Sequence, residues 1–176
     1  MSRYILAPDS FKESLTAIEA TEAMAAGVHD ADPTAETVAC PMADGGEGFA
    51  LTLAPSLGAE PIAVPSHDAL GRPIEGLIHR IGDTVVLDVA TACGLELVEP
   101  ALRDVLNCDS YGVGELVLAA LDTGARRLVI GLGGSATNDG GAGMLAALGV
   151  RFLDARGRPV ATTPTGLAHL ASLDVG

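Results

Sequence analysis

The sequence has no tryptophan, and aromatic residues make up only 3% of its 176 residues. Proteins that bind single-stranded nucleic acid stack bases on aromatic side chains, and this chain has few of them. Positive charge is also scarce, because ten Lys and Arg residues stand against 23 Asp and Glu residues and leave a formal net charge of −13. This balance argues against nucleic acid and against anionic membranes as partners.

Cysteine is sparse as well. Cys40, Cys93 and Cys108 are odd in number, far apart and without a CxxC spacing, which argues against a disulfide framework and a zinc site. We expect reduced thiols that are buried or half-buried. The sequence shows no apolar run typical of a signal peptide near residue 1, and no uninterrupted apolar stretch of transmembrane length. We therefore expect a cytoplasmic protein without a membrane partner.

Hydrophobic residues make up 48% of the chain, which is typical of a folded globular protein. In the first 60 residues the predicted elements alternate, with strands at 3–8 and 36–43 and helices at 14–28 and 46–58. Thr16 and Glu19 have the spacing of a capping box at the start of the first helix. Strands that alternate with helices favour a parallel sheet with crossover helices, and hence an α/β fold.

The pattern changes after residue 70. Residues 73–90 alternate between polar and apolar on either side of Gly82-Asp83, which predicts an antiparallel hairpin. The remaining predicted elements are a helix at 111–125, a strand at 126–132, a helix from 142 and a strand at 149–160.

Three loops that are rich in glycine and acid follow predicted strands, at 7–14, 41–48 and 131–141. Ligands of open α/β sheets bind at the carboxyl ends of strands, and the N–H groups of a helix start favour anions. One such loop alone would be an ordinary turn, but three of one type indicate a phosphate or carboxylate site. The acidic residues beside these glycines are Asp9, Asp44, Glu47 and Asp139. Their negative charge is compatible with a bound phosphate if Mg²⁺ lies between the carboxylates and the phosphate.

The only lysine, Lys12, lies in the first of these loops, whereas the other nine basic residues are arginines. An ammonium at a helix start is a usual phosphate partner, although a solvated surface lysine fits the sequence equally well. The four histidines follow no ligand spacing and are expected at the surface or half-buried. Asp68 either belongs to a site or caps the turn before Gly71 and Pro73.

A dinucleotide-binding unit is the nearest generic alternative. "GLGGSA" matches G-x-G-x-x-A through Gly131, Gly133 and Ala136, and Asp154 lies where a ribose-binding acid belongs. Against it, the following helix would begin with the polar, glycine-rich "SATNDGG", and the unit would start late in the chain. The Walker pattern of P-loop NTPases is absent.

Four motifs, "APDSFK", "PMADGGEG", "SYGVGELV" and "GLGGSATNDGGAGMLAALG", occur in an order that resembles the type I glycerate kinase, or glycerate 2-kinase, family. The resemblance runs from Tyr4 to about Gly157. It implies phosphorylation of D-glycerate by ATP with Mg²⁺, to 2-phosphoglycerate or, by older labelling, 3-phosphoglycerate.

The family fold has two α/β lobes, one Rossmann-like and one inserted into it, in a chain roughly twice this length. By this resemblance residues 1–60 start the Rossmann-like lobe. Residues 61–176 form the second lobe, with antiparallel hairpin elements and the "GGSATNDGG" loop. We therefore expect the N-terminal portion of such a kinase and an incomplete fold.

The resemblance also suggests roles for single residues. Lys12 would contact a phosphate or the glycerate carboxylate. Asp9 or Asp44 would hold Mg²⁺ or accept the substrate's hydroxyl proton, with Asp139 as an alternative for either task and Glu47 as a second metal ligand. Asn138 would orient the ligand. The phosphate or carboxylate pocket would be lined by residues that supply N–H and hydroxyl donors, namely Ser10, Gly45, Gly46, Gly133, Gly134, Ser135 and Thr137.

Three positions depart from the family pattern. Glu13 stands where glycine is expected, and Phe49 stands where threonine is expected. Asp109 replaces a small hydroxyl residue and adds negative charge near the predicted phosphate site. These changes bear on the substrate and its affinity.

Two other functions remain open at this stage. The chain could be a catalytically incomplete fragment that pairs with another polypeptide, or, less in keeping with the motifs, a dinucleotide-binding oxidoreductase. If the chain is a fragment, apolar surface intended for the missing half would be exposed, and we would expect self-association through it.

Overall fold

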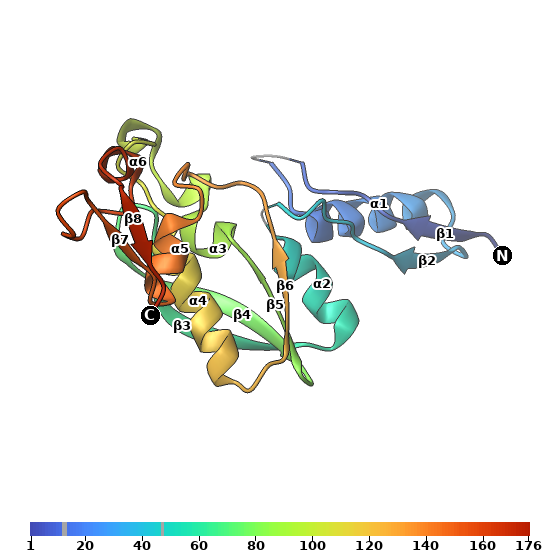
Figure 1. Cartoon of the computed structure of the whole chain (residues 1–176). Helices are drawn as coiled ribbons and strands as arrows, with labels where there is room; N and C mark the ends of the chain where they lie inside the picture. Colours follow the sequence, from blue (N-terminus) through green and yellow to red (C-terminus); the bar gives the residue numbers. More distant parts are fainter. Residues whose placement is uncertain (12–13, 47) are drawn as a thin grey trace.

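The computed structural model describes residues 1–11, 14–46 and 48–176 (Figure 1). Its N-terminal part holds two parallel strands, β1 (Arg3–Leu6) and β2 (Glu36–Ala39), joined by helix α1 (Ala17–Ala31). The predicted capping box is confirmed. The N–H of Glu19 donates to the Thr16 hydroxyl at 3.2 Å, and the Glu19 carboxylate accepts from the Thr16 N–H at 2.8 Å.

The centre of the molecule is a four-stranded sheet in the order β3-β4-β5-β6. Strand β4 runs antiparallel to both β3 and β5, whereas β5 and β6 are parallel to each other. The predicted hairpin is confirmed as β4 and β5, which turn at Gly82. The elements are α2 (Phe49–Leu57), β3 (Glu60–His67), β4 (Pro73–Ile81), β5 (Thr84–Asp88), α3 (Ala90–Cys93), the 3₁₀ turns η1 (Leu95–Leu97) and η2 (Pro100–Leu102), α4 (Tyr111–Asp122) and β6 (Arg127–Gly131).

Strand β3 is not among the elements that the sequence predicts. Pro61 and Pro65 interrupt its apolar pattern, and proline cannot donate to a sheet ladder. The strand tolerates both prolines because it is an edge strand of this sheet and pairs only with β4, over its whole length.

Helices cover both faces of the sheet. Leu116 of α4 packs where Gly76 of β4 leaves room, and both lie on the side of the buried Ile78 and Leu87. Successive strand residues point to opposite faces, so Asp88 and His79 face the other way. That face is covered by α2, whose Ala50 N–H donates to Asp88. The main apolar core therefore lies between the sheet and α4.

The predicted domain boundary at residue 60 remains a prediction. Helix α2 precedes this boundary in the chain, yet it packs on β4 and β5, which follow it.

The C-terminal part adds α5 (Ala142–Ala147), β7 (Arg151–Leu153), α6 (Pro164–Leu167) and β8 (Ser172–Asp174). β7 and β8 form a separate antiparallel pair. The predicted strand at 149–160 is too long, because the chain turns at Asp154. The carboxylate of Asp154 accepts hydrogen bonds from the N–H groups of Arg156 and Arg158 and so closes the turn.

Two predictions from the sequence, one about the cysteines and one about Asp68, can be compared with the structure. All three cysteines are free; Cys93 and Cys108 are buried as predicted, whereas Cys40 is exposed. Asp68 caps the turn between β3 and β4, since it accepts from the N–H groups of Leu70 and Arg72 and pairs with the Arg72 guanidinium. No helix in the described part of the chain is long and apolar enough to cross a membrane.

Candidate functional site

The three glycine-rich loops come together. The first two follow parallel strands and meet where the Met42 N–H donates to the Pro8 carbonyl at 2.9 Å. The second and third loops touch through their backbones. A Cβ atom added to Gly133 would lie 2.7 Å from Gly46 Cα, and one added to Gly131 would lie 2.9 Å from the Gly45 carbonyl oxygen. Glycine is therefore required where these two loops cross.

The third loop is also held against the segment that follows α3. The Ala136 N–H donates to the Cys93 carbonyl at 2.8 Å, and the Leu95 N–H donates to the Gly134 carbonyl at 2.7 Å. Within the loop, the Ser135 and Thr137 hydroxyls lie 2.7 Å apart and the Ser135 hydroxyl accepts from the Thr137 N–H at 3.1 Å. The loop thus presents two adjacent hydroxyl groups on a fixed backbone.

Two predicted acids are exposed at this junction. Asp44 accepts from the Gly46 N–H through Oδ1 at 2.8 Å, and Asp9 accepts from the Ser10 N–H through Oδ1 at 2.7 Å. Each carboxylate keeps its Oδ2 without a hydrogen bond to a described residue. The two could therefore still bind a cation or accept a proton. Lys12 and Glu47 lie outside the described residues.

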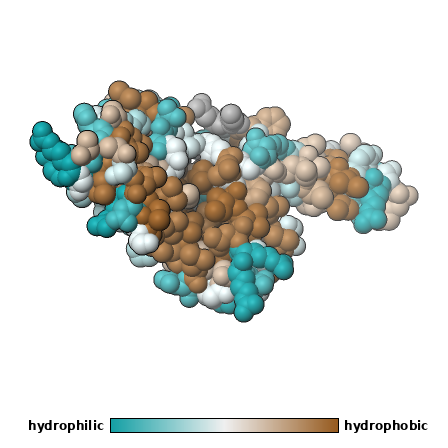
Figure 2. All heavy atoms as spheres, viewed as in Figure 1, coloured by the Kyte–Doolittle hydropathy of each residue, from teal (hydrophilic) through white to brown (hydrophobic). Residues whose placement is uncertain are grey.

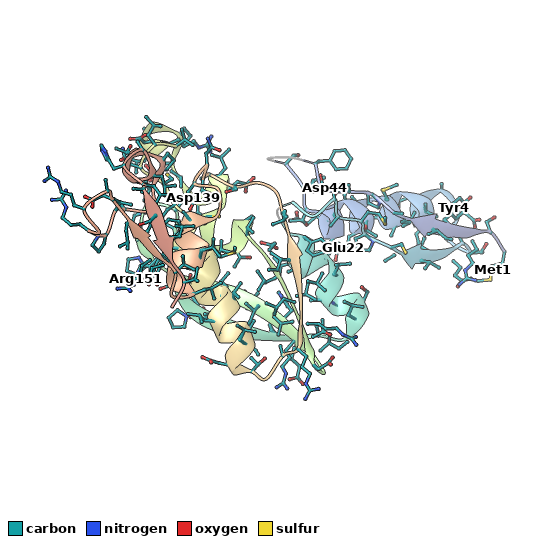
Figure 3. The ribbon with its side chains drawn as sticks, viewed as in Figure 1. Met1, Tyr4, Glu22, Asp44, Asp139 and Arg151 are labelled. Atoms are coloured by element: carbon teal, nitrogen blue, oxygen red, sulfur yellow. The ribbon has the colours of Figure 1, made fainter. Side chains whose placement is uncertain are left out.

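Asp139 has a different environment. It is buried, with 6% of its surface exposed, and lies near the start of α5, apart from Asp44 in Figure 3. Its carboxylate accepts from the N–H groups of Gly141, Gly143 and Ser110 and from the Ser110 hydroxyl, at 2.8 to 3.0 Å. Burial alone would raise the pKa of Asp139, but the hydrogen bonds from Gly143, Ser110 and Gly141 outweigh it and hold the pKa below its ordinary value. This geometry favours a structural task for Asp139.

Asn138 and Gly134 of the same loop are exposed, and the Asn138 side chain makes no hydrogen bond to a described residue. Asp109 holds the C-terminal part in place rather than facing an open site, because it accepts from the Thr162 hydroxyl at 2.5 Å.

A pocket of about 250 Å³ adjoins the third loop. Ser135 and Thr137 line one side, and the segment between η2 and α4 lines the other with Arg103, Asp104 and Cys108. Burial raises the pKa of the Cys108 thiol, and it also raises that of Cys93 behind the loop, so both thiols stay protonated at neutral pH. The pocket therefore offers hydroxyl groups and one guanidinium group rather than a reactive thiolate.

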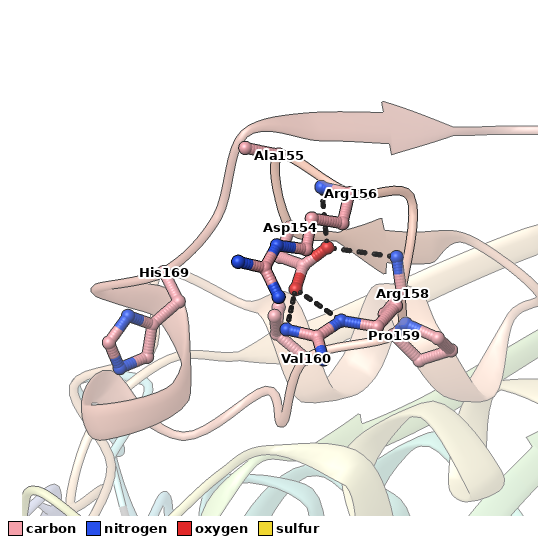
Figure 4. A pocket seen from close by; sticks show the side chains of 7 residues that line it. All are labelled: Asp154, Ala155, Arg156, Arg158, Pro159, Val160 and His169. Atoms are coloured by element: carbon pink, nitrogen blue, oxygen red, sulfur yellow. Dashed lines mark hydrogen bonds and ion pairs between the residues drawn. The ribbon is translucent and has the colours of Figure 1, made fainter.

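A larger hollow of about 660 Å³ lies on the β7–β8 unit, between Asp154, Arg158 and His169 (Figure 4). No residue of the glycine-rich loops lines it. The Asp154 carboxylate inside it is already paired with the Arg158 guanidinium at 2.7 Å. Its position away from the loops makes it a poor candidate for the site that the sequence predicts.

The same region argues against dinucleotide binding. In that alternative the strand carrying Asp154 would lie beside β6, with the acid free to bind a ribose. Instead β7 pairs with β8 and lies outside the four-stranded sheet, and the Asp154 carboxylate accepts hydrogen bonds from Arg156 and Arg158 within its own turn.

Two residues of this site were not found from the sequence. Ser110 precedes α4, where a serine usually caps its own helix, but its hydroxyl instead binds Asp139 and accepts from the Met144 N–H. A serine just before a predicted helix is a signal that could have singled it out. Nothing in the local sequence marks Arg103.

The described residues contain no group of three His, Cys, Asp or Glu side chains that could hold a metal ion. A cation at the junction would therefore depend on few carboxylates and on ligand oxygens, as Mg²⁺ sites often do.

Comparisons with known proteins identify the family. The glycerate kinase family model matches residues 4–176. A glycerate kinase of Bacillus subtilis (strain 168) is 46% identical over 175 residues, and a glycerate 2-kinase of Escherichia coli (strain K12) is 43% identical over 176 residues; each match covers 98% of this chain and 46% of the relative. The chain thus spans slightly less than half the length of these relatives.

The fold agrees with a solved structure as well. A crystal structure from Salmonella typhimurium LT2 that carries the name glycerate kinase 2 superposes with a TM-score of 0.81 at 41% identity, over 99% of this chain and 48% of that one. The resemblance noted in the motifs and the predicted α/β fold are both confirmed. This chain belongs to the glycerate kinase family.

Proposed function

We propose that this chain supplies the phosphate- and substrate-binding loops of an enzyme that phosphorylates D-glycerate with ATP, with 2-phosphoglycerate as the favoured product. The supporting observation is that three glycine-rich loops meet at the carboxyl ends of β1, β2 and β6. Phosphoryl transfer needs positioning and charge neutralisation more than covalent chemistry, and such loops provide both.

In this proposal the backbone of Gly45, Gly46, Gly133 and Gly134 lies against the phosphate groups. Asp9 and Asp44 are the acids whose Oδ2 atoms remain available, so one accepts the proton of the reacting hydroxyl and the other serves the metal. Asp44 fits a Mg²⁺ site as one exposed carboxylate, the number that Mg²⁺ often takes beside phosphate oxygens. When bound, Mg²⁺ would neutralise charge on the transferred group. Lys12 and Glu47 remain predictions of the sequence.

The test is a coupled assay of ADP release by the purified chain in ATP and Mg²⁺, with and without D-glycerate. We expect glycerate-dependent release that Asp44→Ala lowers about a hundredfold or more in kcat/KM. The matched control is Asp30→Ala, an exposed aspartate near the end of α1. Wild-type activity in Asp44→Ala would remove Asp44 from the mechanism.

The product is identified by coupling to enolase. Enolase alone consumes 2-phosphoglycerate, whereas 3-phosphoglycerate is consumed only after phosphoglycerate mutase is added. A signal that requires the mutase would contradict the favoured product.

A second candidate is a kinase portion that is inactive by itself. It is favoured by the chain's 46% coverage of its relatives and by apolar surface at the open edge of the sheet. Figure 2 shows apolar residues gathered at the centre of its view, over β6 and its neighbours. The large apolar side chains exposed on α2 and β6 are Leu51, Leu57 and Val129, followed by Leu132 just beyond β6. Leu118 and Leu121 are exposed on α4, which covers the other face of the sheet.

In this reading the remaining half of a longer relative, added as a separate polypeptide, restores glycerate-dependent ADP release to a chain that is folded but inactive. Absence of turnover both alone and with that half would contradict the proposed kinase activity. The predicted self-association through the same apolar surface is measured by sedimentation velocity.

A further inference from the structure

We propose that Arg103 selects the carboxylate of the substrate, in the 250 Å³ pocket between the third glycine-rich loop and the segment after η2. This inference rests on the proposed function and names the part of the site that recognises the acid. The pocket is smaller than the roughly 300–1,000 Å³ typical of sites for drug-sized ligands. It suits a three-carbon hydroxy acid rather than a nucleoside triphosphate.

The charge of the chain makes a local cation necessary. With a formal net charge of −13, an anionic substrate is repelled at long range and must be met by a placed positive group. Among the described residues that line the pocket, Arg103 is the single basic side chain. A guanidinium group binds a carboxylate with two parallel hydrogen bonds, which fixes orientation as well as charge.

The backbone around Arg103 holds its side chain in place. Its Nε donates to the carbonyl of the fully buried Val98 at 3.1 Å. That contact fixes one edge of the guanidinium group. Neither terminal nitrogen has a hydrogen bond or ion pair with a described residue, so both remain for a ligand.

The opposite wall supplies partners for the hydroxyl groups of the acid. Ser135 and Thr137 place their hydroxyls 2.7 Å apart, and each can both donate and accept. Asp104 also lines the pocket, but both of its oxygens serve the local turn. Oδ1 accepts from the Leu106 N–H at 3.1 Å, and Oδ2 accepts from the Asn107 side chain at 2.7 Å. These donors compensate part of its negative charge.

The experiment follows D-glycerate binding to the full 176-residue chain by titration of backbone amide NMR signals. Glycerol, which has the same three carbons but no carboxylate, is the comparison probe. We expect saturable shifts with glycerate at residues 103–105 and 135–137, and none with glycerol. Arg103→Met should weaken glycerate binding about 10- to 100-fold, as loss of a charged hydrogen-bonded pair does. The glycerate affinity of Arg103→Lys should lie between those of the wild type and Arg103→Met, because lysine keeps the positive charge but cannot form the two parallel hydrogen bonds of a guanidinium group.

Arg80→Met is the matched control. Arg80 is also exposed, and its Nε also donates to a backbone carbonyl at 3.1 Å, that of Gly82, but it lies outside the pocket. Glycerate affinity in this variant should equal that of the wild type. Circular dichroism checks that each variant is folded. Since Arg103 is exposed, we expect both methionine variants to retain the wild-type spectrum.

Three results would overturn the inference: equal affinity in wild type and Arg103→Met, shifts centred away from the pocket, or no saturable shift at millimolar glycerate. The ADP-release assay separates this inference from the proposed function. Binding that depends on Arg103 without turnover supports the inference and leaves the kinase activity unsupported. Turnover whose KM for glycerate is unchanged by Arg103→Met supports the kinase and overturns the inference.

Discussion

Asp139 accepts two hydrogen bonds from Ser110, one from its main-chain N–H and one from its hydroxyl, both at 2.8 Å. The N–H groups of Gly141 and Gly143 complete a set of four donors around the same carboxylate. Helix α5 is only six residues long, and α4 begins next to Ser110. One side chain therefore joins the end of the third glycine-rich loop to the starts of two helices.

The first prediction concerns the strength of that junction. Asp139→Asn should lower the free energy of unfolding by about 2–4 kcal/mol, because the amide NH₂ would face N–H donors inside a buried site. Urea denaturation followed by circular dichroism measures the change. Asp122→Asn, an exposed aspartate at the end of α4, is the control and should change stability by no more than about 0.5 kcal/mol. Equal losses in both variants would contradict the structural task assigned to Asp139.

The second prediction is the pH dependence that Asp139 confers. Its pKa in the folded chain is lowered from the ordinary value of 3.8, so the folded state holds the proton less tightly than the unfolded state. This stabilisation is complete well above pH 3.8 and is lost as the pH falls through the lower folded value. Unfolding free energies measured across this acid range should fall more steeply in the wild type than in Asp139→Asn. Parallel curves would show that the carboxylate is not stabilised by its donors.

The third prediction concerns His79, which the sequence analysis expected at the surface or half-buried. It is 5% exposed on the α2 face of β4, and its Nδ1 has no hydrogen-bond partner among the described residues. Burial lowers the pKa of His79 below 6.5, and the negative charge of Asp88 offsets part of that effect. Below pH 6.5 the unfolded chain therefore binds a proton that the folded chain resists, and stability falls as the pH drops toward the folded pKa.

His79→Leu should remove this slope, since leucine is apolar, cannot titrate and leaves no polar atom unpaired. Thermal unfolding between pH 7.5 and the acid range compares the variant with the wild type. His29→Leu, at an exposed position on α1, should keep the wild-type slope. An unchanged slope in His79→Leu would mean that the buried ring is not the group responsible.

The elements predicted correctly are those whose signals are local. The Thr16–Glu19 capping box spans one helical turn, and the β4–β5 hairpin is marked by alternation around Gly82-Asp83. The three glycine-rich loops were placed after strands because turn residues follow apolar runs directly. In each case the residues that decide the structure lie within a few positions of one another.

What the sequence did not show depends on contacts between distant positions. Ser110 and Asp139 lie 29 residues apart in the sequence, and no local pattern shows that the Asp139 carboxylate accepts hydrogen bonds from Ser110 and so joins the starts of two helices. Arg103 lines the pocket only because the segment after η2 folds back on the third loop. The sites suggested for Asp9 and Asp44 remain predictions, whereas their exposure is a result of the structure.

The last prediction uses two glycines to test the packing of α5 on α4. A Cβ added to Gly143 would lie 2.6 Å from the Ser110 nitrogen and closer still to that of Tyr111, where rigid backbone leaves no room. Gly143→Ala should therefore lower the free energy of unfolding by about 1–3 kcal/mol, the usual cost of overpacking. Gly27 lies inside α1, and apart from its chain neighbours and the backbone of its own helix no atom lies within 4 Å of its added Cβ, so Gly27→Ala should raise stability by about 0.5–1 kcal/mol through helix propensity. Urea denaturation of both variants measures these opposite signs. A stabilised Gly143→Ala would show that α5 does not pack against the start of α4 as described, and the position of the loop beside it would then have to be reconsidered.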